Sequence, residues 1–526
     1  MAERVHGGAG AGPGALRPLP FKLALLGGFV SGALYFTAFA GMDIWPFAFV
    51  CFVPLYISLL GQTPRRALFI GLAAGATMNA FGFYWLLEML RVFSGFPVPL
   101  CLLFVLLVAT YQGGRLALMG WLFARGAIRG WSRGPVFVAA FIASELFFPV
   151  LFPWYYAAAV HQLPALTQVA DLGGPILVGV VLLLVNMALA EPLLARLEKR
   201  PWDRRVLATG GGALVATLLY GLVRIAMVDA QVARAEPLHV GIVQGNMGLM
   251  QKREDPGEGL RRHKRLTQEL RQKGAELVVW SESSVTFAVP EAMTNPFMKD
   301  RVAGSAGVPL IFGAVVFRVD PDRERWYNTA LSTNRQGEVT ARYDKHFLLA
   351  FGEYLPFGEE LPILHRWSPN SGRFSKGTTF APLLFEKDGK THKIGTLICY
   401  EDILPGFTRE AVAASDPELL VNITNDAWFG DTLEPWQHLA LSKFRAIEHR
   451  RYLVRSTNSG VSAIVDPVGR TLLTTKTFAP ASADAVIHWM RATTLYQITG
   501  DIPWLLVTAA AFFMAFRARK PRPLAA

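Results

Sequence analysis

The sequence predicts a polytopic α-helical membrane protein that carries one α/β domain. Hydrophobic residues make up 52% of its 526 residues, and charged residues only 17%, against about 25% in ordinary soluble domains. Long apolar runs fill residues 21–227 and 502–516, whereas residues 229–500 alternate short strand-like runs with polar helical ones. This apolar composition excludes an intrinsically disordered protein. A total of three cysteines excludes a small protein held together by disulfides.

About eight segments are apolar enough to span a bilayer, which takes about 20 residues in a helix. The expected spans lie near residues 21–40, 44–61, 67–88, 97–116, 135–151, 173–193, 206–227 and 501–516. The chain then divides into an N-terminal tail (1–20), seven spans (21–228), the α/β domain (229–499) and the last span with a basic tail (500–526).

Basic residues predict how the spans are oriented. Residues 230–500 hold 32 Lys and Arg against 30 Asp and Glu, so most of the net charge of +12 lies elsewhere. It gathers before span one, after spans two, four and six, and in the tail, whereas the opposite loops hold only Arg91. By the positive-inside rule both termini are cytoplasmic, and the domain lies outside, in the periplasm of a two-membrane bacterium. The alternative for span one is that it is a signal peptide cleaved after Ala40. Cleavage would not change the predicted orientation of the later spans. A nearly neutral domain without a basic stripe predicts no nucleic-acid partner.

Within the domain, short apolar runs end in polar clusters. Strands are expected at 238–246, 275–280, 308–319, 394–399 and 419–424, a hairpin at 331–343, and helices at 256–275 and 436–451. This alternation predicts a layered α/β domain whose site lies beyond the carboxyl ends of the strands.

Three of these strand ends carry reactive side chains, namely Glu282, Lys345 and Cys399. A thiol attacks a carbonyl only after it loses its proton; a carboxylate can take that proton, and an ammonium can stabilise the oxyanion that forms. The three residues therefore make a complete acyl-transfer site. Taken singly, each has a plainer interpretation, as an inert core thiol or a solvated charge, and composition and spacing leave that choice open.

Longer motifs around these residues resemble the Glu-Lys-Cys triad segments of the nitrilase superfamily. They are Trp-Ser-Glu at 280–282, Tyr-Asp-Lys-His at 343–346 with Phe-Gly-Glu-Tyr-Leu-Pro at 351–356, Ile-Cys-Tyr-Glu at 398–401 and Asn-Asp-Ala-Trp-Phe-Gly at 425–430. The whole chain is similar to the apolipoprotein N-acyltransferase family of bacterial inner membranes, which residues 170–174, 243–246 and 500–503 also match. The resemblance implies a nitrilase-like αββα sandwich for the domain.

The resemblance also implies a two-step acyl transfer. Glu282 would deprotonate Cys399, which attacks a phospholipid ester, with phosphatidylethanolamine as the expected donor, and Lys345 would stabilise the oxyanion. The α-amino group of an S-diacylglyceryl cysteine at an apolipoprotein N-terminus would then attack the thioester. The family motifs assign supporting roles, with structural carboxylates as the alternative, to Glu353 beside Lys345, to the backbone at Tyr400, and to Glu401 under the cysteine loop.

Both substrates carry acyl chains, and moving about 15 methylenes from lipid to water costs on the order of 12 kcal/mol. We therefore expect an apolar portal between the domain and the helices. Its candidate lining residues are Phe347, Leu348, Leu349, Phe351, Trp428 and Phe429. Plain domain core is the alternative for each of them.

Three positions depart from the family pattern. Ser281 stands where Pro is common, residues 247–252 contain no Trp, and no Arg follows Glu145 by one turn. Ionisable residues inside a membrane are costly, so Glu88 and Glu145 are candidates for function or for hydrogen bonds between helices. No metal or other cofactor is expected, and the protein is expected to be a monomer.

Two other functions stay open. A membrane-anchored nitrilase-type amidase would use the same triad with water as the acceptor, but it would not explain so many spans. A transporter with an inactive external domain would place its site on polar or broken helices near the midplane.

Overall fold

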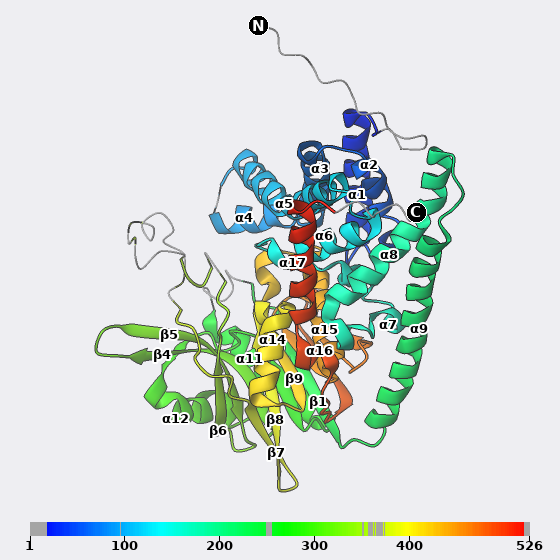
Figure 1. Cartoon of the computed structure of the whole chain (residues 1–526). Coiled ribbons are helices and arrows are strands. Elements are labelled where there is room, and N and C mark those ends of the chain that lie inside the picture. Colours follow the sequence, from blue (N-terminus) through cyan, green and yellow to red (C-terminus); the bar gives the residue numbers. More distant parts are fainter. Residues whose placement is uncertain are drawn as a thin grey trace.

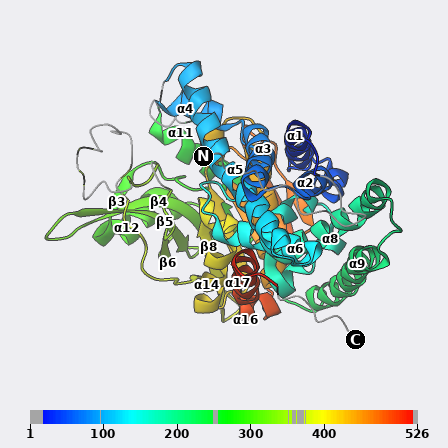
Figure 2. The same ribbon diagram turned by 45° about the horizontal axis from the view of Figure 1, so that its top comes forward.

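The computed structural model describes residues 18–94, 96–248, 255–349, 352–355, 361, 363, 372 and 374–519. Figure 1 shows two parts, a bundle of helices from the first half of the chain and, below it, an α/β domain. The C-terminal helix α17 returns to the bundle. In Figures 1 and 2 alike, strands β4 to β6 lie at the edge of the molecule away from α8 and α9.

The bundle has an apolar helix on each of the eight predicted segments. The helices are α1 (Phe21–Thr37), η1 (Trp45–Phe49), α2 (Phe52–Leu59), α3 (Pro64–Gly82), α4 (Leu86–Ser94), α5 (Val98–Ile128), α6 (Arg133–Phe147), η2 (Tyr156–Val160), α7 (Pro164–Thr167), α8 (Ala170–Glu198), α9 (Arg204–Val232), α16 (Leu495–Thr499) and α17 (Ile502–Phe516). By length and composition α5, α8 and α9 can each cross a membrane, and α3 with α4 makes a fourth candidate bent by 55°. The count of eight therefore stays a prediction.

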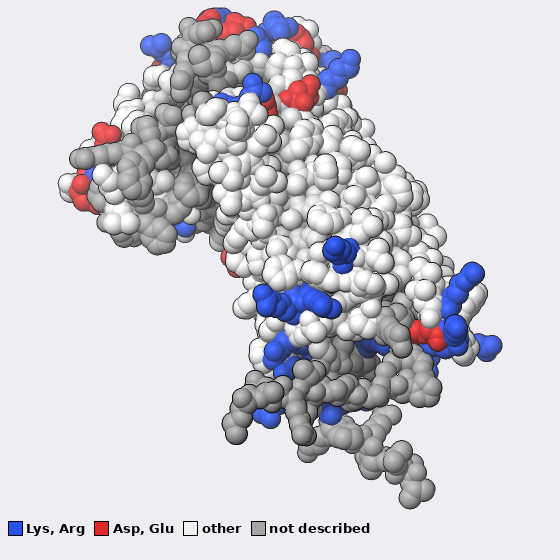
Figure 3. All heavy atoms as spheres, turned by 90° about the horizontal axis from the view of Figure 1, so that it is seen from above, with Lys and Arg blue, Asp and Glu red and all other residues white. Residues whose placement is uncertain are grey.

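The surface of the bundle is largely apolar. Figure 3 shows a broad, nearly uncharged face between two charged ends. Leu106 and Leu107 on α5, and Leu219 and Leu222 on α9, are each more than half exposed. Continuous exposed apolar surface of this kind is unusual in a soluble protein and typical of one that contacts lipid.

The α/β domain has two sheets packed face to face between helices. One sheet has the order β13-β1-β2-β4-β5-β6 with β3 beside β4, and the other β12-β11-β10-β9-β8-β7. The strands of the first are β1 (Pro237–Gln244), β2 (Leu277–Trp280), β3 (Ala288–Pro290), β4 (Leu310–Val319), β5 (Glu324–Thr333), β6 (Val339–Asp344) and β13 (Ala481–His488). Those of the second are β7 (Leu383–Lys387), β8 (Lys390–Ile398), β9 (Leu419–Thr424), β10 (Leu453–Thr457), β11 (Ala463–Val465) and β12 (Thr471–Thr474).

Hydrophobic cores define the layers of this sandwich. Side chains of both sheets, such as Val240 and Val421, share one core. Helices α11 (Pro256–Gln272) and α12 (Thr294–Met298) cover the outer face of the first sheet, and α14 (Pro405–Ser415) and α15 (Glu434–His449) that of the second. The predicted α/β sandwich is therefore confirmed.

Several boundaries differ from the prediction. The span predicted at 67–88 breaks between α3 and α4, and α9 runs four residues into the segment assigned to the domain. Strand β5 begins at Glu324, because it pairs with β4 over ten residues. The short strands β3, β7 and β10 to β13, of three to eight residues, and the 11-residue helix α14 are absent from the prediction, since such short runs carry no clear periodicity.

Candidate active site

The three predicted catalytic residues follow strands of both sheets. Glu282 comes two residues after β2, and Lys345 directly after β6, both in the first sheet. Cys399 comes directly after β8 in the second sheet, at the start of η5 (Cys399–Ile403). The sandwich brings them together: Lys345 Nζ lies 3.5 Å from Glu282 Oε1, and the charges of both act on the thiol of Cys399.

The protonation states of the site follow from burial and from neighbouring charge. Burial raises the pKa of the Cys399 thiol well above its usual range, and Glu282 raises it further against the opposing effect of Lys345. Burial lowers the pKa of Lys345, but Glu282, Cys399 and Glu353 outweigh it, so that pKa is raised. The resting site thus holds a neutral thiol beside an ammonium, and the thiol needs a base before it can react.

A second glutamate completes the surroundings of the lysine. Lys345 Nζ lies 2.8 Å from Glu353 Oε2 and 2.9 Å from its Oε1. Asn328 on β5 donates from Nδ2 to Glu282 Oε1 at 2.6 Å and to Glu353 Oε1 at 2.9 Å. Sequence reasoning missed Asn328, because an Asn inside a strand carries no local signal; it becomes visible only once β5 lies between β4 and β6.

Glu401 joins the two sheets at the site. It accepts hydrogen bonds from the Tyr343 hydroxyl at 2.9 Å and from the backbone N–H groups of His346 at 2.7 Å and Phe347 at 2.9 Å, all within two residues of Lys345. It also accepts the N–H of Ile398 at 2.8 Å, directly before Cys399. Burial raises the pKa of Glu401 to about 7 against these N–H donors.

The backbone turn at Cys399 is strained, and hydrogen bonds from neighbouring strands of the second sheet stabilise it. Cys399 has φ 54°, in the left-handed region that non-glycine residues seldom adopt. Asn422 on β9 donates to the carbonyls of Cys399 and Leu397, both at 3.2 Å, and accepts from Arg455 at 2.8 Å. Arg455 on β10 also donates to Asp402 at 2.7 Å. The sequence did not indicate that Asn422 and Arg455 support Cys399, because they lie on other strands at no recognisable spacing from it.

Next to this turn lies a buried group of charged side chains. Arg455 and His438 both bond the carboxylates of Asp402 and Asp426. Burial and Arg455 lower the pKa of His438, but Asp402 and Asp426 outweigh them and raise it to about 10. Ligand atoms of Asp426, Glu434 and His438 lie within 4.8 Å of one another, a spacing that could hold a metal ion. Arg455 and His438 already bond the two aspartates, and burial raises the pKa of Glu434.

Aromatic side chains link the site to the helical bundle. The Tyr400 hydroxyl donates to the carbonyl of Leu151, after α6, at 2.6 Å. The ring of Phe347, 43% exposed, stacks on Tyr400 at 5.7 Å between centroids. Phe429 contacts Trp85 of the bundle at 5.0 Å, and Trp85 contacts Phe152 at 5.3 Å.

The other candidate portal residues differ in position. Leu348 is buried, which fits the core alternative better than a lining role. Leu349 is half-buried, and so is Trp428 in η6 (Asp426–Phe429). Phe351 lies outside the described residues, as do residues 249–252 of the segment without Trp.

The two membrane glutamates have different partners. Glu145 on α6 lies 3.3 Å from Arg115 on α5, so an arginine 30 positions earlier supplies the cation that the sequence after Glu145 lacks. Arg115 also donates to the carbonyl of Trp154 at 2.7 Å. Glu88, near the end of the bent α3–α4 pair, lies 3.1 Å from Arg91 with both side chains about half exposed.

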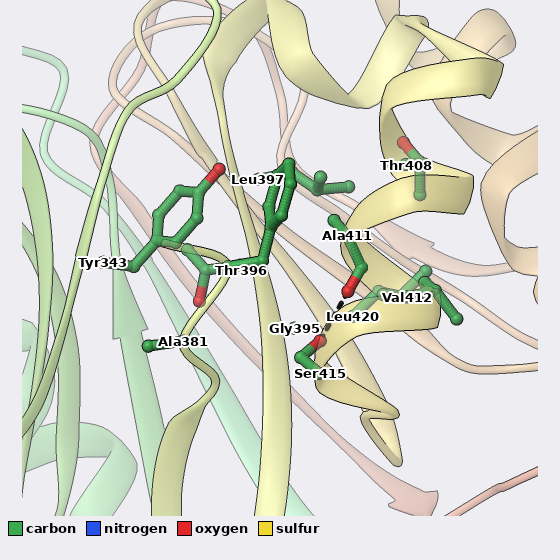
Figure 4. Close-up of a pocket in the computed structure, with 11 residues that line it drawn as sticks. Tyr343, Ala381, Gly395, Thr396, Leu397, Thr408, Ala411, Val412, Ser415 and Leu420 are labelled. Atoms are coloured by element: carbon green, nitrogen blue, oxygen red, sulfur yellow. Dashed lines mark hydrogen bonds between the residues drawn. The ribbon is translucent and has the colours of Figure 1, made fainter. Parts of the chain in front are cut away.

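A small pocket between β8 and α14 is a separate feature. Figure 4 shows Tyr343, Thr396 and Leu397 on one side and Thr408, Ala411 and Val412 on the other. Its lining contains no acid, amine or thiol, so it offers none of the groups that acyl transfer requires.

Comparison with known proteins gives this site a class and a family. The carbon-nitrogen hydrolase family model matches residues 239–486. Fold and site thus define a carbon-nitrogen hydrolase-type domain attached to a helical bundle. A second model, the apolipoprotein N-acyltransferase N-terminal domain, matches residues 31–188 of that bundle.

Relatives extend the match to nearly the whole chain. The apolipoprotein N-acyltransferase of Azotobacter vinelandii is 33% identical over 454 residues, which cover 84% of each chain. That of Pseudomonas putida is 30% identical over 486 residues, covering 90% of this chain and 92% of the relative. That of Geobacter metallireducens is 29% identical over 505 residues, covering 93% and 94%. The chain belongs to the apolipoprotein N-acyltransferase family. Among solved structures, an amidase of the nitrilase superfamily from Nesterenkonia is 19% identical, with a TM-score of 0.35, covering 51% of this chain and 95% of that one.

Proposed function

We propose that this enzyme moves an acyl chain from a phospholipid, through a thioester on Cys399, to the α-amino group of the S-diacylglyceryl cysteine at an apolipoprotein N-terminus. The observation that carries the proposal is the buried Lys345, 1% exposed, which lies between Glu282 and Glu353 and acts electrostatically on a neutral thiol. A thiol, a base and a fixed cation are the groups that an acyl-enzyme mechanism requires.

In the first half-reaction Glu282 accepts the Sγ proton while sulfur attacks the ester carbonyl. The Lys345 ammonium stabilises the oxyanion. When the tetrahedral intermediate collapses, the C–O bond breaks, and the glycerol oxygen of the lysophospholipid takes the proton back from Glu282. Cys399 is left as a thioester.

In the second half-reaction the α-amine of the apolipoprotein attacks the thioester. Glu282 accepts a proton from the attacking nitrogen, and Lys345 again stabilises the oxyanion. Collapse breaks the C–S bond, and the sulfur recovers its proton from Glu282. The products are an amide-linked third acyl chain and the free thiol.

The aromatic contacts at the bundle support a lipid route to this site. Phe347 and Phe429 lie where the domain meets the helices, beside Tyr400 and Trp85. We assign these two residues to the portal, because chains that pass there stay in apolar surroundings. Trp428 and Leu348 are weaker candidates.

The full assignment places the protein in a bacterial inner membrane. It has about eight spans, both termini in the cytoplasm, and the domain at 229–499 in the periplasm. The donor is phosphatidylethanolamine, and the enzyme acts as a monomer, since one chain supplies all three residues of the triad. An amidase with water as acceptor is not favoured, because the similarity to N-acyltransferases covers the bundle as well as the domain.

Mass spectrometry of a lipoprotein N-terminal peptide tests this function in cells depleted of the protein. We expect the third acyl chain to disappear and to return with the wild-type protein but not with Cys399→Ala. Cys101→Ala is the matched control, because Cys101 is a buried free thiol on α5 of the bundle, hydrogen-bonded to the carbonyl of Phe96. A third chain that persists with no second enzyme to supply it would contradict the assignment.

A further inference from the structure

The site holds two carboxylates around one ammonium. Glu282 and Glu353 both lie next to Lys345, and each lies within 3 Å of the same nitrogen of Asn328. Two carboxylates at such a spacing tend to share one proton, because each raises the pKa of the other. A proton retained on Glu282 would prevent it from accepting the proton of Cys399.

Asn328 is placed to prevent this. Its side chain is buried, 4% exposed, and its Nδ2 group gives one hydrogen to each glutamate. An N–H donor favours the ionised form of the carboxylate that accepts it, and an amide does so without adding charge. The carbonyl of Asn328 also accepts the backbone N–H of Lys345 at 2.8 Å, so the same residue fixes the start of the lysine loop.

The charged groups described near Glu282 act in opposite directions. Lys345, after β6, lies closer to Glu353 than to Glu282. Glu353 carries negative charge, and Cys399, after β8, carries it once ionised. Asn328 thus adds one N–H donor to each of the two carboxylates, and Glu353 also accepts the backbone N–H of Leu349 at 2.8 Å.

We propose that Asn328 is a positioning residue that keeps Glu282 ionised beside Glu353, so that Glu282 is free to accept the proton of Cys399. This inference rests on the proposed function, since it concerns the base of that reaction. On this proposal Asn328, a neutral residue on β5, sets the pH above which Glu282 is ionised and the enzyme becomes active.

The test is the pH dependence of acylation of Cys399 in the full-length protein. Intact mass follows thioester formation in a single turnover with phosphatidylethanolamine in detergent micelles, from pH 5 to 9. Asn328→Asp keeps the shape of the side chain but removes both N–H donors and adds a third carboxylate. We expect the acidic limb of its profile to move up by at least about one pH unit, which is about tenfold in the fraction of ionised base at a given pH on that limb. Asn328→Ala, a second variant without the added charge, is expected to shift the limb in the same direction by less.

Ser332→Ala is the matched control. Ser332 lies on the same strand, is 2% exposed, and its hydroxyl bonds Thr340 at 2.8 Å, outside the site. It is expected to lose some thermal stability and to keep the wild-type limb. A limb that stays in place in both Asn328 variants, with rates that fall equally at every pH, would show a merely structural role and overturn the inference. If the wild-type protein forms no thioester at any pH, the proposed function itself fails.

Discussion

The two sheets of the domain contribute to the site in different ways. The first sheet supplies its charges, Glu282 and Lys345, with the amide of Asn328 between the two glutamates. The second supplies the nucleophile, Cys399, on a strained turn that Asn422 and the buried Arg455 hold from behind. Neither sheet alone contains a working site. Catalysis therefore depends on how the sheets pack against each other. Glu401 links them, because it accepts hydrogen bonds from residues that belong to both sheets or directly follow them.

The largest expected effect comes from removing the base of the first sheet. Glu282→Gln should slow acyl transfer by about 10²- to 10⁴-fold, the usual contribution of a general base. The same change should speed alkylation of Cys399 by iodoacetamide at pH 7.5, because Glu282 is one of the groups that raise the pKa of the thiol. Measuring both rates on one preparation separates the two effects. A loss of both would point to misfolding instead, and Glu269→Gln on the surface of α11 serves as the control.

Removing the hydrogen bonds by which Glu401 links the two sheets should have the next largest effect. Glu401→Gln places an N–H group against at least one of the donors that now bond the carboxylate, which costs about 1–3 kcal/mol. We expect a lower melting temperature in detergent and acyl transfer reduced by about one order of magnitude, since 1.4 kcal/mol corresponds to tenfold. Unchanged stability and activity would show that the sheets are held together by other contacts.

The stability of the wild-type protein should also depend on pH through Glu401. Its pKa of about 7 in the folded protein exceeds the value of about 4.3 in an unfolded chain, so the folded state binds this proton more tightly. The contribution is complete below about pH 4 and is lost as pH rises to about 7. Melting temperatures measured across this range should show a slope that Glu401→Gln removes. An identical slope in the variant would assign it to another group.

A smaller effect is expected where the second sheet meets the bundle. Tyr400→Phe removes the hydrogen bond to Leu151, which contributes about 0.5–1.5 kcal/mol. Transfer from phosphatidylethanolamine should fall by about two- to tenfold, because that range of energy corresponds to such factors. The alkylation rate of Cys399 should stay close to that of the wild type. A large change in alkylation would mean that Tyr400 acts on the thiol itself.

The smallest effect tests the portal. Phe429→Ala removes the ring that contacts Trp85, and we expect KM for a long-chain phospholipid to rise several-fold while transfer from a short-chain soluble ester is unchanged. Val319→Ala, an exposed apolar position on β4, is the control. An equal loss with both substrates would place Phe429 in the support of the site rather than in the lipid path.

The sequence predicted the parts of this molecule that leave a local pattern. Glu282, Lys345 and Cys399 follow strands within long motifs, and each of the eight apolar runs contains a helix of the bundle, whereas the short helices η2, α7 and α16 lie outside these runs. What it missed depends on contacts between distant segments. Asn328 and Arg455 are polar residues inside strands, and each acquires its place only through a neighbouring strand. The partner of Glu145 is on another helix. No Pro and no pair of Gly residues marks the break between α3 and α4 in the sequence. A single glycine, Gly82, stands at the end of α3.

The most direct test of the account is the intact mass of the purified protein after incubation with phosphatidylethanolamine and no acceptor. We predict a gain of one acyl group, sensitive to hydroxylamine, that Cys399→Ala abolishes and Cys101→Ala keeps. Addition of a diacylated lipopeptide with a free α-amine should discharge it. A wild-type protein that transfers acyl chains to the lipopeptide without ever carrying one on Cys399 would contradict the central claim.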